Sequence, residues 1–510
     1  MPNRVAIVLD CGSTTTRAIA VDPQGRIVAS AARASSSTPQ PNSPDGWVIW
    51  DLDVVFGKAC EACREVVSKL GDAEIVGVTF DTCGADGAPV RLGTDATSRV
   101  PTGNLTYPVI CWQDNRTEAL AASIGERVPT WELFAETGYQ VIPFDSLLRL
   151  IWLRENAPAA LDDADCYMMF AGLLSHALCG EASIDPTAAG TMMCMDMAKR
   201  DWSPRMLALA GLDASFFPRW VEPGQVIGAV HQDGAAASGL PVGTPVIAAG
   251  HDTQFAAVGC GARPGEVVLS SGTWEILMLR HNRFEPTRTG FEEGLIYECD
   301  AEPGLWNPQL LMMGSAVLEW LRDSFFADLA GRDDAYDLMI AEARGFGPGA
   351  GGVAVLPAFV SSTGPMKKHR TKGTILGLEI TTQRGQLYRA ALEGLCFQMR
   401  HALEILSEAT GFQAEGIRAV GGGSKNALWN QLRADVTGLP VTVTEQKEAT
   451  VLGAAMFVFT GGGIYQSVTQ AQEAMNVGEM LVEPSGEAPA YADLYGRYRT
   501  APEVLSSIYN

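Results

Sequence analysis

Apolar residues in the first part of the chain follow two alternating patterns, one typical of β-strands and one typical of amphipathic helices. Short apolar runs at 5–9, 17–21 and 75–80 predict strands. Apolar residues at helical spacing predict helices at 53–70 and 145–156. Strands that alternate with helices in this way predict an α/β domain with a mainly parallel sheet.

A stretch rich in glycine and proline, at 239–245, separates this region from a second set of strands. We therefore predict two domains, 1–247 and 248–510, as the chain length of 510 residues also favours. The second half contains a long helical pattern at about 383–410 that is apolar around much of its circumference. A helix of this kind is expected to be buried.

The turn between the first two predicted strands is suited to hold a phosphate group. Gly12 lacks a Cβ, so the backbone can approach a ligand closely. The hydroxyls of Ser13, Thr14 and Thr15 add hydrogen-bond donors, and Arg17 adds a cation. For this segment alone, an ordinary β-hairpin with a polar turn is an equal alternative.

A second copy of the pattern favours the phosphate interpretation. Residues 269–278 repeat Leu-x-x-Gly-Ser/Thr between apolar runs, with Gly272 and Thr273 at the turn. A glycine cluster at 421–423 suits backbone that passes beside a base or ribose, although such turns are also common packing devices. Since the chain has no Walker A motif, the two hairpins predict a nucleotide clamped in a cleft between two related domains.

Two aspartates could supply the chemistry of phosphoryl transfer. Asp252 follows an apolar strand, where α/β proteins place ligands, and could act as general base toward a hydroxyl. The alternative for Asp252 is a helix N-cap. Asp10 would repel a phosphate directly but could hold Mg²⁺ beside one. This small set suffices because phosphoryl transfer depends mostly on positioning and charge neutralisation.

Several segments could bind the acceptor. Residues 80–87 combine acids and glycines after a strand, which suits sugar hydroxyls but also any loop. Trp112 lies among polar residues, as aromatic rings in sugar sites do, and is equally suited to a core. His251 could bond a substrate hydroxyl. The basic cluster 367–372 is either a solvated loop or an attractor of phosphate.

Composition limits the partners and the compartment. A formal net charge of −22 argues against a nucleic acid or an anionic membrane as partner. No apolar run is long enough to span a bilayer, and the N-terminus lacks the pattern of a signal peptide. Eleven cysteines without framework spacing predict reduced thiols and a cytoplasmic protein. The sequence does not predict an oligomeric state.

Two segments resemble the signatures of the FGGY carbohydrate kinases, a branch of the sugar kinase, actin and Hsp70 superfamily. The first is FDSLLRLIWLREN at 144–156, in which Arg149 replaces the usual lysine. The second is GTILGL at 373–378, followed by QLYRAALE at 386–393. The resemblance covers nearly the whole chain and implies two related actin-like (ribonuclease H-like) ATPase domains with the nucleotide in a cleft between them.

The resemblance also implies ATP and Mg²⁺ as cofactors and a sugar as the acceptor. It makes Asp252 the catalytic base and places Mg²⁺ near Asp10 and Asp252. The residues assigned to ATP are Gly12, Ser13, Thr14, Thr15, Arg17, Gly272, Thr273, Gly422, Gly423 and Asn426. The residues assigned to the sugar are Gly84, Asp86, His251, Asp252 and Thr253.

Within the family, segments 250–255, 270–278 and 421–430 are most similar to kinases that convert L-fuculose to L-fuculose 1-phosphate in fucose catabolism. Kinases of rhamnulose are the nearest alternative, followed by those of other ketoses such as xylulose and ribulose. The basic loop 367–372 departs from the loop expected in xylulose kinases. A nucleotide switch without enzymatic activity is an alternative on the same fold, which both signatures disfavour.

Overall fold

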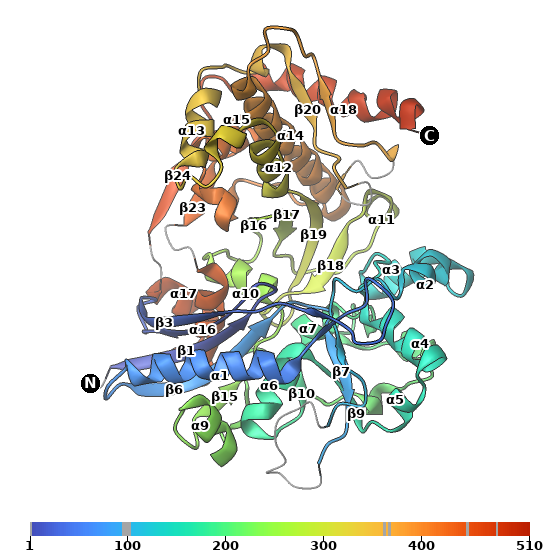
Figure 1. The fold of residues 1–510 in the computed structure, drawn as a ribbon, viewed down its shortest axis with the longest axis vertical. Coiled ribbons are helices and arrows are strands. Elements are labelled where there is room, and N and C mark those ends of the chain that lie inside the picture. The colour runs from blue at the N-terminus through green and yellow to red at the C-terminus, as the bar shows by residue number, and fades with distance from the viewer. Residues whose placement is uncertain are drawn as a thin grey trace. The chain divides into compact units, whose positions relative to one another are not determined.

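The computed structural model describes residues 3–93, 104–360, 364–365, 369–444, 448–475 and 478–509. Its internal contacts divide the chain into two compact units, which are coloured along the chain in Figure 1. Unit 1 comprises Met1–Gly261, Tyr297–Trp306 and Glu448–Val477. Unit 2 comprises Ala262–Ile296, Asn307–Lys447 and Gly478–Asn510.

A mixed six-stranded sheet forms the centre of unit 1. In order across the sheet, its strands are β14 (Val226–Ala229), β15 (Pro245–Ile247), β6 (Glu74–Thr82), β1 (Arg4–Cys11), β2 (Thr15–Val21) and β3 (Ile27–Ala34). Only β6 with β1 and β6 with β15 pair in parallel. The prediction of a mainly parallel sheet is therefore wrong, because the tight turns that join β1, β2 and β3 force antiparallel pairing.

Unit 2 repeats this topology. In order, its sheet contains β19 (Trp306–Met313), β17 (Trp274–Leu279), β16 (Val267–Ser271), β22 (Ile417–Val420), β23 (Val441–Thr444) and β24 (Glu479–Val482). Strand β18 (Ile296–Cys299) belongs mostly to unit 1. From β19 onward the pairs run antiparallel twice, parallel twice and antiparallel once. The same series runs from β3 to β14 in unit 1. The predicted α/β class with two related halves is confirmed.

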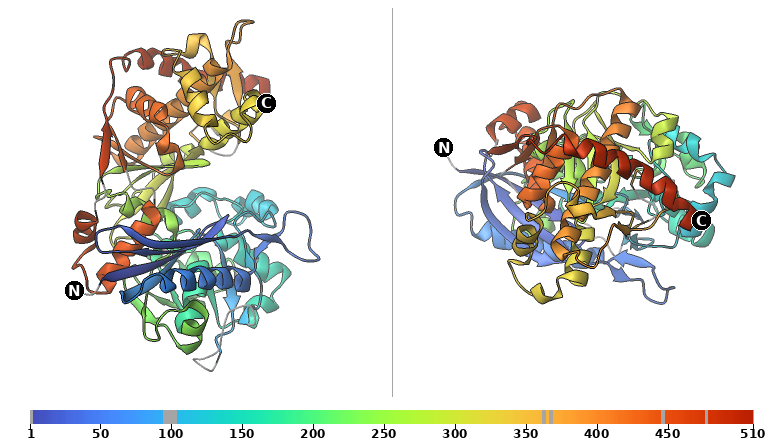
Figure 2. Two further views of the ribbon diagram at one scale, coloured as in Figure 1. Left: turned by 60° about the vertical axis from the view of Figure 1, so that its left-hand side comes forward. Right: turned by 90° about the horizontal axis from the view of Figure 1, so that it is seen from above.

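Helices cover both faces of the unit 1 sheet, because alternate residues of each strand point to opposite sides. Ile7 and Leu9 of β1 pack into one apolar core with residues of α1 (Leu52–Ser68). Ala6 and Val8 pack into another with residues of α16 (Ala449–Gly461). Figure 2 shows α1 in blue and α16 in orange on either side of the blue strands. This three-layer arrangement places the carboxyl ends of β1, β6 and β15 at one edge.

The observed division differs from the predicted boundary between 247 and 248. Helix α10 (Asp252–Gly259) remains in unit 1 because it packs closely against α16. A Cβ on Gly259 would lie 1.8 Å from the Ala449 carbonyl oxygen, and one on Gly453 would lie 1.9 Å from the Phe255 carbonyl oxygen. Glycine is required at both positions, and the late segment that contains α16 completes the first unit.

The predicted helices are present with nearly the predicted ends. Helix α1 is capped by the Asp51 side chain, which accepts from the amide of Val54. Helix α4 spans Ser146–Asn156, and most of the 27 residues of α14 (Arg384–Thr410) are buried, as predicted. No helix among the described residues is long and apolar enough to cross a membrane. All eleven cysteines are free thiols.

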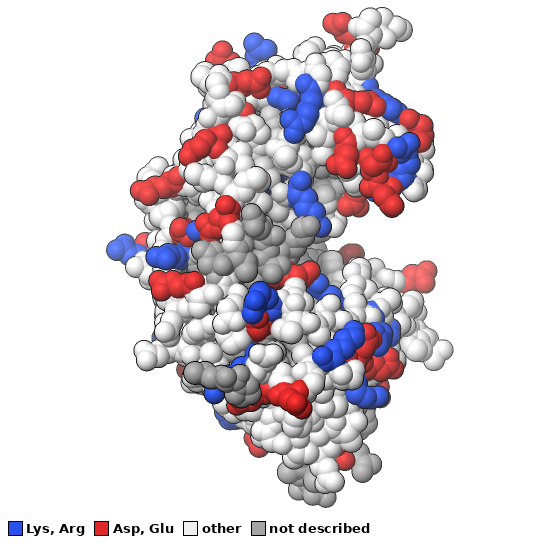
Figure 3. Space-filling view, turned by 90° about the vertical axis from the view of Figure 1, so that its left-hand side faces the viewer, with Lys and Arg blue, Asp and Glu red and all other residues white. Residues whose placement is uncertain are grey.

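The remaining elements complete the two units. Those of unit 1 are β4 (Thr38–Pro39), β5 (Val48–Trp50), β7 (Gly87–Val90), β8 (Val109–Ile110), α2 (Glu118–Ser123), α3 (Thr130–Thr137), α5 (Ala159–Asp162), β9 (Cys166–Met169), α6 (Phe170–Cys179), β10 (Ser183–Ile184), α7 (Pro186–Gly190), β11 (Met195–Asp196), β12 (Asp201–Trp202), α8 (Pro204–Ala208), β13 (Arg219–Trp220), α9 (Gln232–Ser238) and α17 (Val468–Ala474). Those of unit 2 are α11 (Arg288–Glu293), α12 (Ser315–Phe325), α13 (Ala335–Ala343), β20 (Ala354–Leu356), β21 (Thr374–Leu376), α15 (Ala427–Thr437) and α18 (Ala490–Tyr509). On the face drawn in Figure 3, acidic and basic side chains are interspersed.

Candidate active site

The β1–β2 turn has the open backbone that a phosphate would need. The Gly12 amide donates to the Thr15 carbonyl oxygen over 3.0 Å and closes the turn. A Cβ on Gly12 would make only an ordinary contact of 3.5 Å with that oxygen. The fold by itself does not require glycine here, so there is room beside the turn for a ligand. The contacts of Gly12, Ser13, Thr14 and Thr15 with ATP stay a prediction.

Arg17 is occupied by two carboxylates. Its Nε donates to Asp10 Oδ2 over 3.0 Å, and its Nη1 donates to Glu448 Oε2 over 2.7 Å. Both carboxylates reduce the positive charge that Arg17 offers to a phosphate. Its predicted contact with ATP stays a prediction, while its ion pair with Asp10 is a feature of the fold.

Asp10 belongs to a group of aspartates at the end of the sheet. The β1–β6 register places Asp10 opposite Asp81, which is fully buried. Among the described residues, neither carboxylate oxygen of Asp81 has a hydrogen-bond partner. Burial raises the pKa of Asp81 well above its usual value, and Asp10 and Asp252 raise it further. Burial also raises the pKa of Asp10, although Arg17 opposes the shift.

These carboxylates fit a divalent cation that arrives with a nucleotide. Among the residues described, no group of three or more His, Cys, Asp or Glu side chains is arranged to hold a metal alone. Mg²⁺ usually takes one or two carboxylates and completes its shell with water and substrate phosphates. The mutual repulsion of Asp10, Asp81 and Asp252 is what such a cation would relieve. The predicted pair, Asp10 and Asp252, is chemically suitable.

Asp252 is accessible at the start of α10. The N-cap of this helix is His251, and Asp252 Oδ1 accepts from the amide of its own neighbour Thr253 over 2.6 Å. The alternative role of Asp252 as N-cap is therefore wrong. Its side chain is 33% exposed, which leaves its carboxylate open to a ligand. A partly exposed carboxylate at a strand end is suited to accept a proton from a bound hydroxyl.

His251 lies between two carboxylates. Its Nδ1 is 3.1 Å from Asp252 Oδ1, and its Nε2 is 3.5 Å from Glu298 Oε2. Burial lowers the pKa of His251, but Glu298 and Asp252 outweigh this effect and raise it to about 9. The two carboxylates thus favour the protonated ring at neutral pH. The predicted contact of His251 with the sugar stays a prediction, because both ring nitrogens face protein carboxylates. The Glu298 side chain also accepts from Tyr139 Oη over 2.7 Å.

The backbone before Asp252 is fixed by α7. The His251 amide donates to Thr187 Oγ1 over 2.9 Å, and Asp185, the N-cap of α7, accepts from the Thr187 amide over 2.9 Å. A Cβ on Gly250 would lie 2.3 Å from Asp185 Oδ1, so only glycine fits this approach. Burial raises the pKa of Asp185 to about 6, in spite of the hydrogen bonds that lower it.

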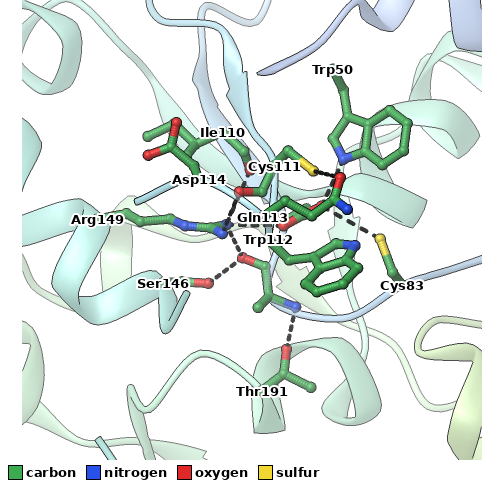
Figure 4. Close-up of polar contacts among 12 residues, drawn as sticks. Trp50, Cys83, Ile110, Cys111, Trp112, Gln113, Asp114, Ser146, Arg149 and Thr191 are labelled. Carbon is green, nitrogen blue, oxygen red and sulfur yellow. Dashed lines mark hydrogen bonds and ion pairs between the residues drawn. The ribbon is translucent and has the colours of Figure 1, made fainter. Parts of the chain in front are cut away.

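The predicted sugar residues divide into an accessible group and a buried one. Gly84 faces the base segment, since a Cβ on it would lie 3.2 Å from His251 Nδ1. Asp86 is fully buried, and its oxygens accept from Trp50 Nε1 over 2.7 Å and from Arg149 Nη1 over 3.0 Å. Figure 4 shows this cluster. A direct contact between Asp86 and the sugar stays a prediction, because protein donors already occupy the carboxylate.

The β16–β17 hairpin of unit 2 holds its charges inside the protein. Glu275 and Arg433 are fully buried and form an ion pair. Arg433 Nη2 also donates to Ser271 Oγ over 2.6 Å. A Cβ on Gly272 would approach nothing nearer than the Trp274 carbonyl oxygen at 3.7 Å, which again leaves room at the turn. The contacts of Gly272 and Thr273 with ATP stay a prediction.

The glycine cluster contains two different kinds of glycine. A Cβ on Gly422 would meet nothing within 4 Å, whereas one on Gly423 would lie 2.1 Å from Ser271 Oγ. Asn426 caps α15, because its side chain accepts from the Trp429 amide over 3.0 Å. Gly422 is therefore free to face a ligand, while Gly423 and Asn426 serve the packing of unit 2. Their predicted contacts with ATP remain untested.

Sequence reasoning missed two buried carboxylates. Asp81 lies within the acidic segment 80–87, and its position beside Asp10 follows once β1 and β6 are paired. The residues next to Glu298 in the sequence do not indicate a site. Glu298 belongs to unit 1 only because the chain returns to that unit at Tyr297–Trp306. Of the basic cluster, Lys367 and Lys368 lie outside the described residues.

Comparisons with known proteins agree with this geometry. The chain matches the models of the FGGY family of carbohydrate kinases, with the N-terminal domain at residues 5–259 and the C-terminal domain at 267–461. It is 40% identical over 478 residues to L-fuculokinase of Escherichia coli K12, which covers 92% of this chain and 95% of that protein. It is 29% identical over 505 residues to autoinducer-2 kinase of Enterobacter sp. 638, at 96% and 91% coverage.

A solved structure has the same fold over the whole chain. The xylulose kinase of Rhodospirillum rubrum superposes with a TM-score of 0.87 at 26% identity, covering 99% of this chain and 100% of that one. Membership of this family implies ATP as the phosphoryl donor, as the resemblance predicts. Both family domains, a relative at 40% identity and the shared two-unit fold lead to one conclusion. The chain belongs to the FGGY family of carbohydrate kinases.

Proposed function

We propose that the protein catalyses the ATP-dependent phosphorylation of L-fuculose at its C1 hydroxyl, giving L-fuculose 1-phosphate. The observation that most supports the chemistry is the partly exposed carboxylate of Asp252 beside a protonated His251 and the backbone of Gly84. The 40% identity to an L-fuculokinase, against 29% to an autoinducer-2 kinase, supports the choice of sugar.

In the proposed reaction, Asp252 accepts the proton of the C1 hydroxyl. The C1 oxygen forms a bond to the γ-phosphorus of ATP while the bond from that phosphorus to the bridging oxygen breaks, and ADP leaves with the electron pair. His251 holds the carboxylate of Asp252 in place and lies beside the bound sugar. Asp10 and Asp252 would hold Mg²⁺, whose charge offsets that of the phosphates when it is bound.

We propose that the enzyme acts in the cytoplasm on ATP and a small sugar. Eleven free cysteines, ten of them buried, support a reducing compartment. The net charge of −22 supports small molecules rather than nucleic acid as partners.

A sugar panel tests the proposal. Release of ADP is measured with MgATP and L-fuculose, L-rhamnulose, D-xylulose or D-ribulose, and ³¹P NMR identifies the product. We expect the highest kcat/KM with L-fuculose and a C1 phosphate ester. A higher kcat/KM with L-rhamnulose would contradict the sugar assignment, and no ADP release with any sugar would favour a nucleotide switch.

A further inference from the structure

The turn that carries Gly84 is strained at the next residue. Ala85 has φ of 65°, in the left-handed region that a residue with a Cβ rarely adopts. The Asp86 amide donates to the Gly84 carbonyl oxygen over 2.9 Å, which is the hydrogen bond of a γ-turn. The form with positive central φ is the rare, strained form. Such strain persists only where the surroundings enforce it.

Three side chains enforce it, as Figure 4 shows. Arg149 Nη1 and Ser146 Oγ, both from α4, donate to the Ala85 carbonyl oxygen over 2.9 and 2.7 Å. The Ala85 amide donates to Thr191 Oγ1, at the end of α7, over 2.7 Å. Both backbone polar groups of Ala85 are therefore held from outside the turn. We call Arg149, Ser146 and Thr191 the turn brace.

Arg149 also ties the turn to a second segment. Its Nη1 donates to the Ile110 carbonyl oxygen over 3.1 Å, and its Nη2 donates to the Cys111 carbonyl oxygen over 2.9 Å. Trp112 follows Cys111 directly in the chain, and its Nε1 donates to Ser13 Oγ over 3.1 Å. The guanidinium is only 1% exposed. A lysine ammonium would keep the charge but could not reach all these acceptors from one point.

The strained turn lies directly beside the proposed catalytic group. A Cβ on Gly84 would lie 2.7 Å from Thr191 Cγ2 and 3.2 Å from His251 Nδ1. The position of Gly84 relative to His251 thus depends on the conformation of Ala85. A shift of the turn would change the surface that faces a sugar hydroxyl.

On the basis of the function proposed above, we propose that Arg149, Ser146 and Thr191 are positioning residues that force Ala85 into its left-handed conformation, fix Gly84 against the sugar and thereby determine which ketose is accepted. Discrimination between sugars that differ at one carbon rests on a few such hydrogen bonds and contacts.

Arg149→Lys and Ser146→Ala test the brace, with KM and kcat measured for L-fuculose, L-rhamnulose and ATP. We expect Arg149→Lys to raise the KM for L-fuculose about tenfold or more, as expected for loss of hydrogen bonds from a charged donor. The preference for L-fuculose over L-rhamnulose should fall. The KM for ATP should rise less than the KM for L-fuculose, because only the hydrogen bond from Trp112 to Ser13 leads from this segment to a residue assigned to ATP. Ser146→Ala should act in the same direction and more weakly. The matched control is Arg154→Lys, from the same helix, whose guanidinium contacts Asp162 and the Ala210 carbonyl oxygen.

Ala85→Gly supplies a rescue that a merely structural role would not show. Glycine adopts positive φ without a brace, so Ala85→Gly combined with Arg149→Lys should recover most of the lost sugar affinity and selectivity. If Arg149 only supports folding, Arg149→Lys lowers the active fraction and kcat with an unchanged KM, and Ala85→Gly restores nothing. That pattern would overturn the proposal.

The brace and the proposed function can fail separately. If the unmodified enzyme prefers another ketose, the sugar assignment fails, and the same KM comparison is made with the preferred sugar. If it phosphorylates no ketose, the melting temperature provides the readout. Ala85→Gly should then stabilise Arg149→Lys more than it stabilises the unmodified protein. Equal stabilisation in both backgrounds would overturn the brace.

Discussion

The β1–β2 and β16–β17 hairpins occupy equivalent places in two sheets of the same topology, yet they use charge in opposite ways. At the first hairpin, Asp10 lies near Asp81 and Asp252, and Arg17, which Asp10 shares with Glu448, does not balance this group. At the second, Glu275 and Arg433 neutralise each other inside the protein. Unbalanced buried charge is typical of functional sites, and balanced charge of architecture. We infer that the first hairpin serves the chemistry and the second shapes the ATP site.

The largest effect is expected from Asp252→Asn, which removes the proposed general base from the group of aspartates beside the first hairpin. Loss of a general base lowers kcat by about 10²- to 10⁴-fold, while ATP affinity should remain close to that of the unmodified protein. Steady-state kinetics and calorimetric titration with ATP measure the two effects. Asp53→Asn, which alters an exposed aspartate in the first turn of α1, is the matched control. Turnover within threefold of the unmodified enzyme would refute Asp252 as the base.

Glu275→Gln should lower the free energy of unfolding, because it removes the negative charge of the buried ion pair at the second hairpin. It leaves the Arg433 guanidinium buried without its ionic partner, which costs about 3–5 kcal/mol of unfolding free energy. Urea unfolding measures the loss. The control Asp334→Asn breaks the exposed pair with Arg332 and should leave the free energy of unfolding nearly unchanged. Equal losses in the two variants would mean that the buried pair is not structural.

Two substitutions in the glycine cluster distinguish packing from ATP binding within unit 2. Gly423→Ala forces a Cβ to 2.1 Å from Ser271 Oγ and should cost about 1–3 kcal/mol by overpacking. Gly422→Ala has open space and should leave stability unchanged while it raises the KM for ATP. Thermal unfolding and ATP kinetics separate the two. An unchanged KM for ATP in Gly422→Ala would argue against adenosine binding at this glycine.

Asp185→Asn tests how much unfolding free energy unit 1 loses because it buries an unpaired carboxylate. Burial raises the pKa of Asp185 from 3.8 to about 6, so the native state loses stability as the pH rises through this interval. Asparagine is an equally good N-cap without that loss. The variant should gain about 3 kcal/mol at neutral pH and nothing below about pH 4, as measured by urea unfolding at both values. A gain confined to acidic pH would contradict this assignment.

Local patterns predicted the hairpins and the helices well. Helices α1, α4 and α14 begin and end within two residues of the predicted limits, because capping and apolar periodicity depend only on residues that are close in the sequence. Glu298 could not be predicted, since its place beside His251 depends on a chain return. The strain at Ala85 was equally hidden, because a γ-turn held by α4 and α7 leaves no mark in the local sequence.

The return of Glu448–Val477 to unit 1 determines the order in which the protein can be built. The ribosome makes β1 long before α16. Val451, Leu452 and Phe457 of α16, which cover one face of that strand's sheet, emerge nearly 450 residues later. Until then, this apolar face of the first unit lacks the cover that α16 provides. Domains usually fold as they leave the ribosome. Here the N-terminal half cannot complete its own core until most of the second unit has been synthesised.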